Sequence, residues 1–472
     1  MRMRHFGLLA TAVVGLCGGR GAAQMPKPTE LPVVAPPSAA VPAPPAVMPA
    51  QPGAYGALQD ITGCPPPAAE TPPPPPPYGG PFHDRAKMLG DWCGIRSQLR
   101  EHGLTFDIYS TNFYTGVANG GLQETFKYRG RADYLLHVDG EKAGLWKGSF
   151  IDLHGESVFG DSINKYTGSL LPVSLAQVLP AGSQSVTALT GVKFTQALSE
   201  SFIVFGGKIN TLDNFNQPFT GGARGVDGFL NTGFLFNPVF ARTIPYSTFG
   251  GGFAYLVDLQ PVVSFSVFDA NNTPTTTGFP SFFNNGAVYV PQINIPTNFF
   301  GLPGHQGITA TFSTKRYSEI DRSTFTNPIV FGVAPQTKSN SWSMAYNFDQ
   351  TIYAAPDDPK RSWGAFGNLG LADQNPSPFR WFANIGVGGS SPLPCRKLDS
   401  FGIGYYYLGV NTSLKNLAPQ RLPIRDEQAI EAFYNVGVTP WFHVTPDLQV
   451  VLPGQTRASS ALILGLRAKI DF

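Results

Sequence analysis

The sequence is short of charge, and beyond its N-terminus it has no long apolar segment. Only 14% of its 472 residues are charged, against about 25% in a soluble domain. A membrane-spanning helix needs about 18 or more consecutive apolar residues, and no such run follows the first residues, so spanning helices are excluded. Strands with alternating apolar and polar side chains explain both absences, because their two faces average to a hydropathy near zero, here −0.05.

Cysteine is also scarce, with four residues in the chain. Cys17 falls within a predicted signal peptide, which leaves Cys64, Cys93 and Cys395 in the mature protein. Three thiols form at most one internal pair, in a compartment that permits oxidation. No metal-ligand cluster, phosphate-binding glycine loop or nucleic-acid surface is apparent, so we expect no metal, no cofactor and no nucleic-acid partner.

The first hundred residues divide into three segments. Residues 1–23 have a basic start, an apolar core and small residues at the end, which predicts a secretory signal peptide; a lipoprotein signal at Cys17 is the less favoured alternative, because Leu16 is bulky. Residues 24–82 are rich in proline, which predicts a disordered periplasmic linker or, alternatively, a tether to the cell wall or a partner. Residues 83–103 suit a short helical segment that Gly103 ends.

The last stretch, Ala461–Phe472, shows a strand pattern most clearly. With a side-chain period of two, one face is apolar throughout and the other carries Arg467, Lys469 and Asp471. Phe126–Asp139 repeats this pattern with more charge. A charged strand face cannot lie in a dry core, because removing the charges from water is costly. It must meet water while the opposite face meets an apolar surrounding.

Similar strands fill the rest of the chain from residue 104. An even number of them returns both chain ends to the same side of a barrel. The predicted strands number about sixteen: Thr105–Val117, Phe126–Asp139, Ser149–Val158, Val186–Leu198, Phe202–Asn210, Gly252–Leu259, Val262–Asp269, Ala287–Phe299, Gly307–Tyr317, Ser341–Ala354, Trp363–Ala372, Phe379–Gly388, Ser400–Val410, Gln428–Val438, Phe442–Leu452 and Ala461–Phe472.

The connections between these strands alternate in length. Short ones include residues 199–201, 260–261 and 439–441, and long ones include residues 161–185 and 211–251. Short periplasmic turns and long external loops are typical of outer-membrane barrels. The sequence therefore predicts an all-β protein, a 16-stranded antiparallel transmembrane β-barrel over residues 104–472, in the outer membrane of a Gram-negative bacterium.

From about Gly90 to its end the chain also resembles the carbohydrate-selective porins of the OprB type. The segments that carry the resemblance keep the family's order and spacing: Gly90-Asp-Trp-Cys-Gly-Ile-Arg96, Gly206-Gly-Lys208, Trp363-Gly-Ala-Phe-Gly367, Asp399-Ser-Phe-Gly-Ile-Gly-Tyr-Tyr-Tyr407, Glu431-Ala-Phe-Tyr-Asn435 and Val438-Thr-Pro-Trp-Phe442. The resemblance implies a homotrimeric porin that passes glucose and related small sugars by facilitated diffusion. It also implies contacts with the lipid bilayer and with the assembly machinery through Phe472.

Two cysteines depart from the family pattern. Cys93 and Cys395 stand where the family usually has glycine, and the strand count places both on the periplasmic side. We therefore hypothesise a disulfide between Cys93 and Cys395 that fixes the N-terminal segment to the barrel. Two unpaired thiols are the alternative, with Cys64 free or in an intermolecular bond.

Side chains that point into the lumen are the candidates for contact with a sugar. Charged groups replace the water that sugar hydroxyls lose at a constriction, and the two signs together suit a neutral polyhydroxyl. The alternative is an ordinary solvated salt-bridge network. The predicted pore-lining residues are Arg129, Arg131, Asp133, Asp152, His154, Glu156, Lys208, Arg224, Asp227 and Glu431.

The loop 211–251 carries Arg224 and Asp227 among many Phe and Gly residues. A loop this long is usually functional or disordered, and its apolar content predicts packing inside the barrel as a constriction. A surface loop that serves a trimer contact is the alternative.

Other classes of function fit the sequence less well. An outer-membrane enzyme would need a nucleophile beside a base, but the histidines are scattered and no G-x-S-x-G motif occurs, so we expect no enzyme. A secreted all-β carbohydrate-binding protein or glycosidase would need polar outer faces. Within porins, a general or anion-preferring channel remains the alternative to a sugar-selective one.

Overall fold

The computed structural model describes residues 78–181, 185–215, 217–320, 336–417 and 423–472. The predicted signal peptide, residues 1–23, and the proline-rich linker up to residue 77 lie outside the described residues. Within the described ranges, no helix is long and apolar enough to span a membrane.

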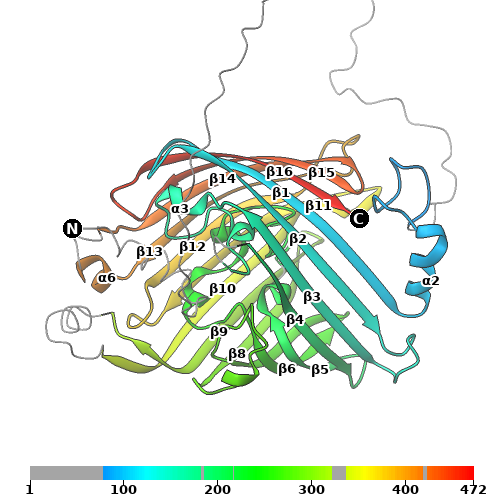
Figure 1. The fold of residues 1–472 in the computed structure, drawn as a ribbon, viewed down its shortest axis with the longest axis horizontal. Coiled ribbons are helices and arrows are strands. Elements are labelled where there is room, and N and C mark those ends of the chain that lie inside the picture. Colours follow the sequence, from blue (N-terminus) through cyan, green and yellow to red (C-terminus); the bar gives the residue numbers. More distant parts are fainter. Residues whose placement is uncertain (1–77, 182–184, 216, 321–335, 418–422) are drawn as a thin grey trace, which may run out of the picture. The chain divides into compact units, whose positions relative to one another are not determined.

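Sixteen antiparallel strands form one closed barrel, in which each strand pairs with its neighbours along the chain and β1 pairs with β16 (Figure 1). Every predicted strand is confirmed, and four have the predicted bounds. The strands are β1 Leu104–Gly121, β2 Thr125–Asp139, β3 Ser149–Gly160, β4 Val186–Ala197, β5 Phe202–Asn210, β6 Ser247–Val257, β7 Gln260–Asp269, β8 Ala287–Phe299, β9 Leu302–Ser318, β10 Thr337–Ala355, β11 Asp358–Ala372, β12 Phe379–Ser390, β13 Ser400–Val410, β14 Glu427–Thr439, β15 Phe442–Leu452 and β16 Ser459–Asp471.

Helices are short and lie before β1 or in the connections. The segment before β1 contains η2 (Trp92–Gly94) and α2 (Ile95–Glu101), which confirms the predicted N-terminal helix. The helices in the connections are α3 Asn164–Thr167, η3 Leu175–Gln177, η4 Thr211–Asn214, α4 Thr232–Leu235, η5 Pro238–Arg242, η6 Phe279–Ser281 and α6 Thr412–Leu417.

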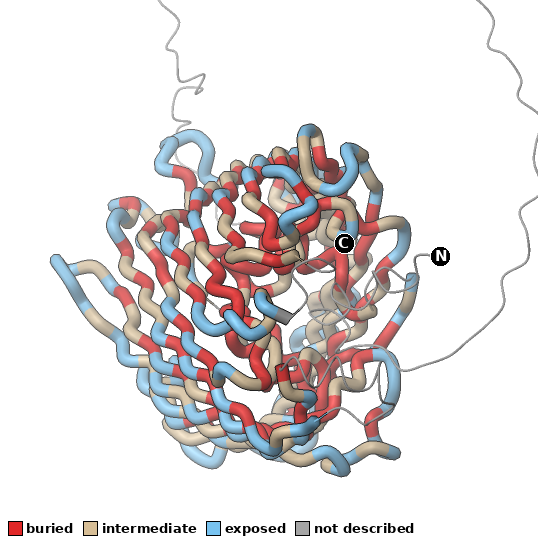
Figure 2. The backbone as a smooth tube through the Cα atoms, turned by 90° about the vertical axis from the view of Figure 1, so that its left-hand side faces the viewer, coloured by how far each residue is buried: buried red, intermediate tan, exposed pale blue. Residues whose placement is uncertain are grey.

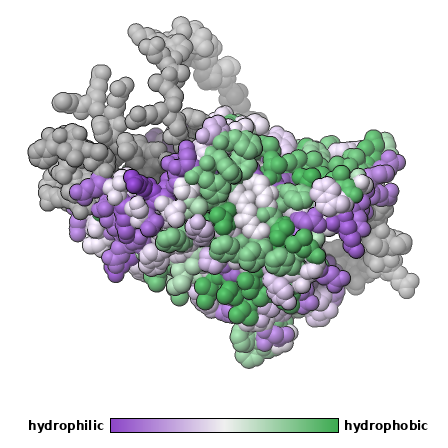
Figure 3. Space-filling model, turned by 90° about the horizontal axis from the view of Figure 1, so that it is seen from below, coloured by the Kyte–Doolittle hydropathy of each residue, from purple (hydrophilic) through white to green (hydrophobic). Residues whose placement is uncertain are grey.

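The barrel wall separates apolar side chains outside from polar side chains inside. On β2, Phe126 and Tyr128 are exposed, whereas Arg129 and Arg131, which alternate with them, are buried. Figure 2 shows the same alternation of buried and exposed positions along neighbouring strands. In Figure 3 apolar side chains gather over the middle of the wall, and hydrophilic ones toward its left-hand end. This distribution fits a wall with lipid outside and polar groups within.

Strand β6 begins five residues before the predicted Gly252, because its glycines belong to the sheet and not to the preceding loop. Gly250 and Gly251 pair with β5 and β7. A Cβ on Gly250 would stand 2.6 Å from the carbonyl oxygen of Val267, and one on Gly251 would stand 2.8 Å from that of Phe205. Glycine is therefore required by close backbone approach, and the long loop spans residues 211–246.

The predicted disulfide between Cys93 and Cys395 is wrong. Cys93 is a free, exposed thiol, whereas Cys395 is disulfide-bonded. Cys93 lies in η2 beside β1, and Cys395 lies in the turn between β12 and β13. Four strand-to-strand steps separate β1 from β13, or about 19 Å at about 4.8 Å a step. A disulfide requires Cα atoms within about 7 Å, and strands four steps apart in the wall do not bring the two cysteines together, so Cys93 stays a free thiol.

Candidate pore constriction

Two long loops fold into the barrel and line its inner wall. One is the β3–β4 loop, described over residues 161–181 and 185, and the other is the β5–β6 loop, described over residues 211–215 and 217–246 and called the inner loop below. The backbone amides of Leu230 and Asn231 in the inner loop donate to the Glu431 carboxylate on β14, at 2.5 and 2.9 Å. This contact confirms that the long loop packs inside the barrel.

The β3–β4 loop is held by the neighbouring carboxylate of the same strand. Glu427 accepts hydrogen bonds from the backbone amides of Leu170 and Leu171, at 2.5 and 3.0 Å, and from Gly454 at 2.9 Å. Both carboxyl oxygens of Glu427 thus accept hydrogen bonds from backbone amides that would otherwise be buried without an acceptor. One inward face of β14 thus anchors both loops.

Aromatic packing fixes the middle of the inner loop against the wall. The ring centroid of Phe229 lies 4.5 Å from that of Phe234, 4.9 Å from that of Phe433 on β14 and 5.6 Å from that of Phe366 on β11. Gly404 on β13 makes room for these rings, because a Cβ there would stand 2.5 Å from Phe234. Phe433 thus faces inward, on the same face of β14 as Glu431.

A buried charge network joins β2 and β3 to the start of the inner loop. Arg131 pairs with Asp133 at 2.7 Å and with Glu156. His154 contacts Asp133 through Nε2 at 3.1 Å and Asp213 of the inner loop through Nδ1 at 2.8 Å. Paired in this way, the charges satisfy one another inside the protein, which offsets the cost of removing them from water.

The ligating atoms of Asp133, His154 and Glu156 lie within 4.8 Å of one another, a spacing that a metal ion could use. Arg131 already donates to both carboxylates. The guanidinium thus supplies the positive charge that the two carboxylates require, and we assign the cluster to the charge network.

Charged side chains that face the lumen gather where the inner loop meets β1 and β16. This mixed-charge cluster consists of Tyr109, Asp213, Arg224, Asp227 and Lys469. The side chains of Asp213, Arg224 and Asp227 are 33, 27 and 47% exposed. Lys469 pairs with Asp227, and Arg224 donates to the hydroxyl of Tyr109.

Tyr109 organises the cations of the mixed-charge cluster. Its ring centroid lies 5.4 Å from Arg224 Cζ and 4.6 Å from Lys469 Nζ. Positive charge is attracted to an aromatic face within about 6 Å. Because Tyr109 itself is buried, it positions the cations and leaves contact with a solute to them.

Neighbouring cations keep the carboxyl group of Asp227 ionised. Burial would raise the pKa of this carboxyl, but the charge of Lys469, its hydrogen bond and the charge of Arg467 together hold the pKa below its usual value. Arg467 is buried beneath the loop and donates to the carbonyl oxygen of Gly228 at 2.8 Å. Asp227 therefore stays ionised at neutral pH.

The structure corrects the sequence prediction for most of the pore-lining residues. Seven of them are nearly or completely buried, because the two loops cover the inner face of the strands that carry them: Arg129, Arg131, Asp133, His154, Glu156, Lys208 and Glu431. Glu431 binds loop amides, and Lys208 donates to the carbonyl oxygens of Leu189 and Thr276 at 2.9 and 2.7 Å. In this structure these side chains are covered and bonded within the protein.

Three predicted residues keep partly exposed side chains. Arg224 and Asp227 belong to the mixed-charge cluster. Asp152 is 39% exposed and pairs with His137 at 2.7 Å and Lys193 at 3.5 Å. This group lies on β2, β3 and β4 nearer their turn ends, so the structure does not bring Asp152 together with the other two.

Sequence reasoning missed Tyr109, Glu427 and the inward fold of the β3–β4 loop. A usable signal for that loop was present: Leu170, Leu171, Val173 and Leu175 are apolar at positions where an external loop would meet water, and they are buried. Tyr109 shares its strand face with buried Thr111 and Phe113, so strand parity placed it inward.

Comparisons with known proteins agree with this architecture. The model of a family described as carbohydrate-selective porin, OprB family, matches residues 123–472. The high-pH structure of Pseudomonas putida OprB is similar with a TM-score of 0.73 and 22% identity, over 83% of this chain and 100% of that one. The low-pH structure of Pseudomonas putida OprB gives a TM-score of 0.52 and 18% identity, over 83% and 99%. No curated protein matches the chain.

Proposed function

The chain belongs to the OprB family of carbohydrate-selective porins, and from this premise we propose that its narrowed lumen passes glucose and similar small sugars by passive diffusion. The barrel places the protein in the outer membrane of a Gram-negative bacterium. Passive diffusion needs no catalytic group, since the concentration gradient drives it.

The mixed-charge cluster is the observation that supports a neutral sugar as the solute. It presents the cation Arg224 beside the anions Asp213 and Asp227, so both donors and acceptors face the lumen. A sugar hydroxyl both donates and accepts, and it exchanges its water for such groups at a constriction. A simple ion would be attracted by one sign and repelled by the other.

The supporting network keeps this cluster in place. Asp213 is held by His154 at 2.8 Å, and Asp227 is held by Lys469. We propose that the buried residues of β2, β3 and β14 act on passage indirectly, by fixing the loop that carries Arg224 and Asp227.

Two assembly properties are proposed on the family resemblance. The channel is proposed to be a homotrimer, and Phe472 is proposed as the residue that the outer-membrane assembly machinery recognises. Chemical cross-linking of the protein in native membranes should give a trimer band, and Phe472→Ala should reduce the amount of heat-modifiable protein in the outer membrane.

Liposome swelling tests the proposed function. Liposomes that contain the purified protein should swell in glucose faster than in neutral solutes of the same size that have fewer hydroxyls, and faster than in disaccharides. Arg224→Ala should change the rate for glucose, whereas Lys397→Ala, in an exposed turn, should not. Equal swelling rates in sugars and in non-sugars of the same size would contradict sugar selectivity and would indicate a general diffusion channel.

A further inference from the structure

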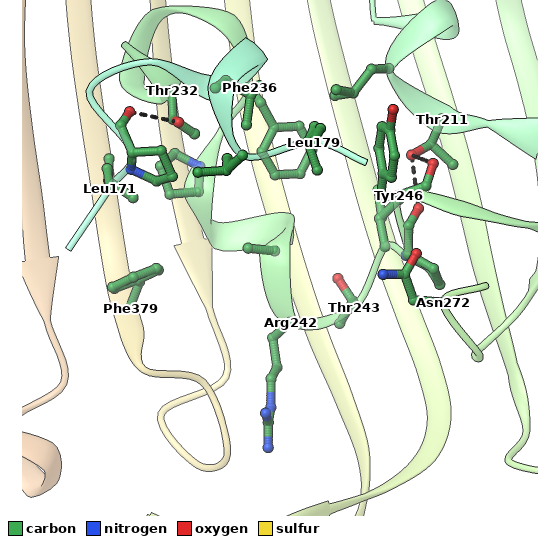
Figure 4. A pocket seen from close by; sticks show the side chains of 18 of the residues that line it. Leu171, Leu179, Thr211, Thr232, Phe236, Arg242, Thr243, Tyr246, Asn272 and Phe379 are labelled. Carbon is green, nitrogen blue, oxygen red and sulfur yellow. Dashed lines mark hydrogen bonds between the residues drawn. The ribbon is translucent and has the colours of Figure 1, made fainter. Parts of the chain in front are cut away.

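A pocket opens between the β3–β4 loop, the inner loop and β9 (Figure 4). Its cavity of about 150 Å³ is lined mostly by apolar side chains, among them Leu175, Val178, Phe236 and Ile244. A cavity of that size holds one six-membered ring. Lys315 lies three residues before β9 ends at Ser318, so the pocket is on the external side of the barrel, where a solute enters.

The uncharged polar groups of this pocket are already bonded within the protein. Thr211 donates to the carbonyl oxygen of Pro245 at 2.8 Å, and Thr232 donates to that of Pro172 at 2.9 Å, as the dashed lines in Figure 4 show. Thr243 donates to Phe240 at 3.2 Å, and Tyr246 donates to Glu156. A solute therefore finds few free partners among them.

Arg242 is different, because its guanidinium makes no hydrogen bond to any of the described residues. In Figure 4 its side chain extends away from the loop backbone. Its Cζ lies 4.8 Å from the ring centroid of Tyr317. Among the described residues no carboxylate pairs with it, and its buried Nε has no hydrogen-bond partner. An arginine has five N–H donors and no acceptor, so the site calls for a ligand with acceptor oxygens.

Lys315 adds a second cation to the same pocket. Its Nζ donates to the carbonyl oxygen of Ala270 at 2.9 Å, which leaves two of its three protons for another partner. The negative charge of Asp269 is near enough to interact with Lys315. The carboxylate oxygens of Asp269, however, already accept hydrogen bonds from the side chain of Asn271 at 2.7 Å and from the backbone amide of Phe283 at 3.0 Å. One structural carboxylate thus faces two cations, and the pocket keeps an excess of positive charge.

We infer that this pocket binds the carboxylate of an acidic monosaccharide, a hexuronate or an aldonate. Arg242 and Lys315 hold the carboxylate, since guanidinium and carboxylate form paired charge-assisted hydrogen bonds. The apolar wall covers the C–H face of the ring or chain. The inference rests on the proposed sugar channel and extends its substrate class from neutral to acidic sugars.

Single-channel recordings with added sugars test this assignment. Glucuronate added on the external side should block the current at about tenfold lower concentration than glucose, which corresponds to about 1.4 kcal/mol of additional binding free energy. Arg242→Met should bring the two blocking concentrations together, and Lys315→Met should do so in part. Lys338→Met is the matched control, because that lysine of β10 already pairs with Asp373 at 3.0 Å.

Three results would overturn the assignment. These are equal block of the wild type by glucuronate and glucose, a glucuronate preference that survives in both methionine variants, and block by acetate at the glucuronate concentration, which would indicate a plain anion site. Failure of the proposed function is separate, because it appears as slow swelling of wild-type liposomes in glucose, whatever glucuronate does to the current.

Discussion

Glu427 and Glu431 lie on one face of β14, and each accepts hydrogen bonds from the backbone amides of a different loop. Their role could not be predicted from strand parity alone. Parity places a charged residue inside the barrel, but whether it meets water or a loop depends on contacts with residues about 200 to 257 positions away in the chain, such as Leu230 and Leu170. The same limitation applies to Arg131 and Asp133, which were predicted to face inward and are covered there.

Glu431→Gln should loosen the inner loop. The glutamine keeps one acceptor oxygen but turns an amide group toward the backbone N–H of Leu230 or Asn231. A buried donor left without an acceptor costs about 1–3 kcal/mol. On gels of samples heated before loading, the folded and unfolded barrels run at different mobilities. The change from the folded to the unfolded mobility should therefore occur at a lower temperature than in the wild type.

Glu200→Gln, in the exposed turn between β4 and β5, is the control for that measurement. Unfolding of both variants at the same temperature would argue against an anchoring role for Glu431.

Asp227 gives the channel a charge that depends on pH in a defined direction. Its pKa in the folded protein is held below the usual value of about 3.9 by Lys469 and Arg467, against the opposing effect of burial. A lowered pKa means that the ion pair with Lys469 stabilises the fold above about pH 4 and is lost as the pH falls through the folded-state value.

Asp227→Asn should therefore shift the reversal potential in a KCl gradient toward anion passage at pH 7. The wild type should show that shift only below about pH 4. Asp258→Asn, in the exposed turn between β6 and β7, should leave the potential unchanged. A wild-type shift near pH 6 would assign the effect to another group.

The strands are the elements that the sequence specifies best. Each has one face toward lipid, so its side-chain alternation is a local property, and β5, β8, β13 and β15 have the predicted bounds. β6 was misplaced at its start, since consecutive glycines are typical of loops unless partner strands approach closely. The apolar content of the two loops indicates that they fold inward, but the wall residues that each loop contacts are set by long-range contacts that no local pattern encodes.

The segment 221–228 of the inner loop leaves the rest of the loop and returns to it at an adjacent point. The amide of Phe229 donates to the carbonyl oxygen of Thr220 at 3.1 Å, so the two ends of the segment are already adjacent. Deleting Gly221–Gly228 removes Arg224 and Asp227 from the lumen without stretching the chain. Single-channel conductance should rise, and selectivity among solutes should fall.

Unchanged conductance of the deletion variant would contradict a constricting role for this segment. The heat-modifiable band of the variant is the control, because it reports whether the barrel still closes.

At the scale of the whole molecule, the N-terminal segment binds the strand that closes the barrel. Arg96 is buried between the rings of Tyr78 and Trp92, each 4.9 Å from its Cζ. Its guanidinium donates to the oxygen of Phe472 at 2.8 Å and to that of Phe106 at 3.1 Å. One side chain thus joins the last residue of the chain to β1.

Arg96→Ala should make the closed barrel less resistant to heat and detergent. A hydrogen bond to a charged group contributes about 1.5–3 kcal/mol, and the loss falls at the β1–β16 junction. The heat-modifiable transition should occur at a lower temperature, while Glu101→Ala, exposed on the same helix, should leave it in place. A transition that does not move would show that the junction holds without this contact.

The two ends of the described chain meet at one rim, where the amide of Met88 donates to the carbonyl oxygen of Asp471 at 2.8 Å. β1 and β16 are paired from Tyr109–Asp471 to Gly121–Ser459, with two register shifts after Val117, so strand pairing closes the wall here as it does between consecutive strands. A circular permutant in which residue 472 is linked to residue 78, and in which the chain begins in the exposed turn 140–148, should therefore fold into the same 16-stranded barrel. The order of the strands around the pore therefore does not depend on where the polypeptide begins, whereas the proposed recognition of Phe472 during assembly does.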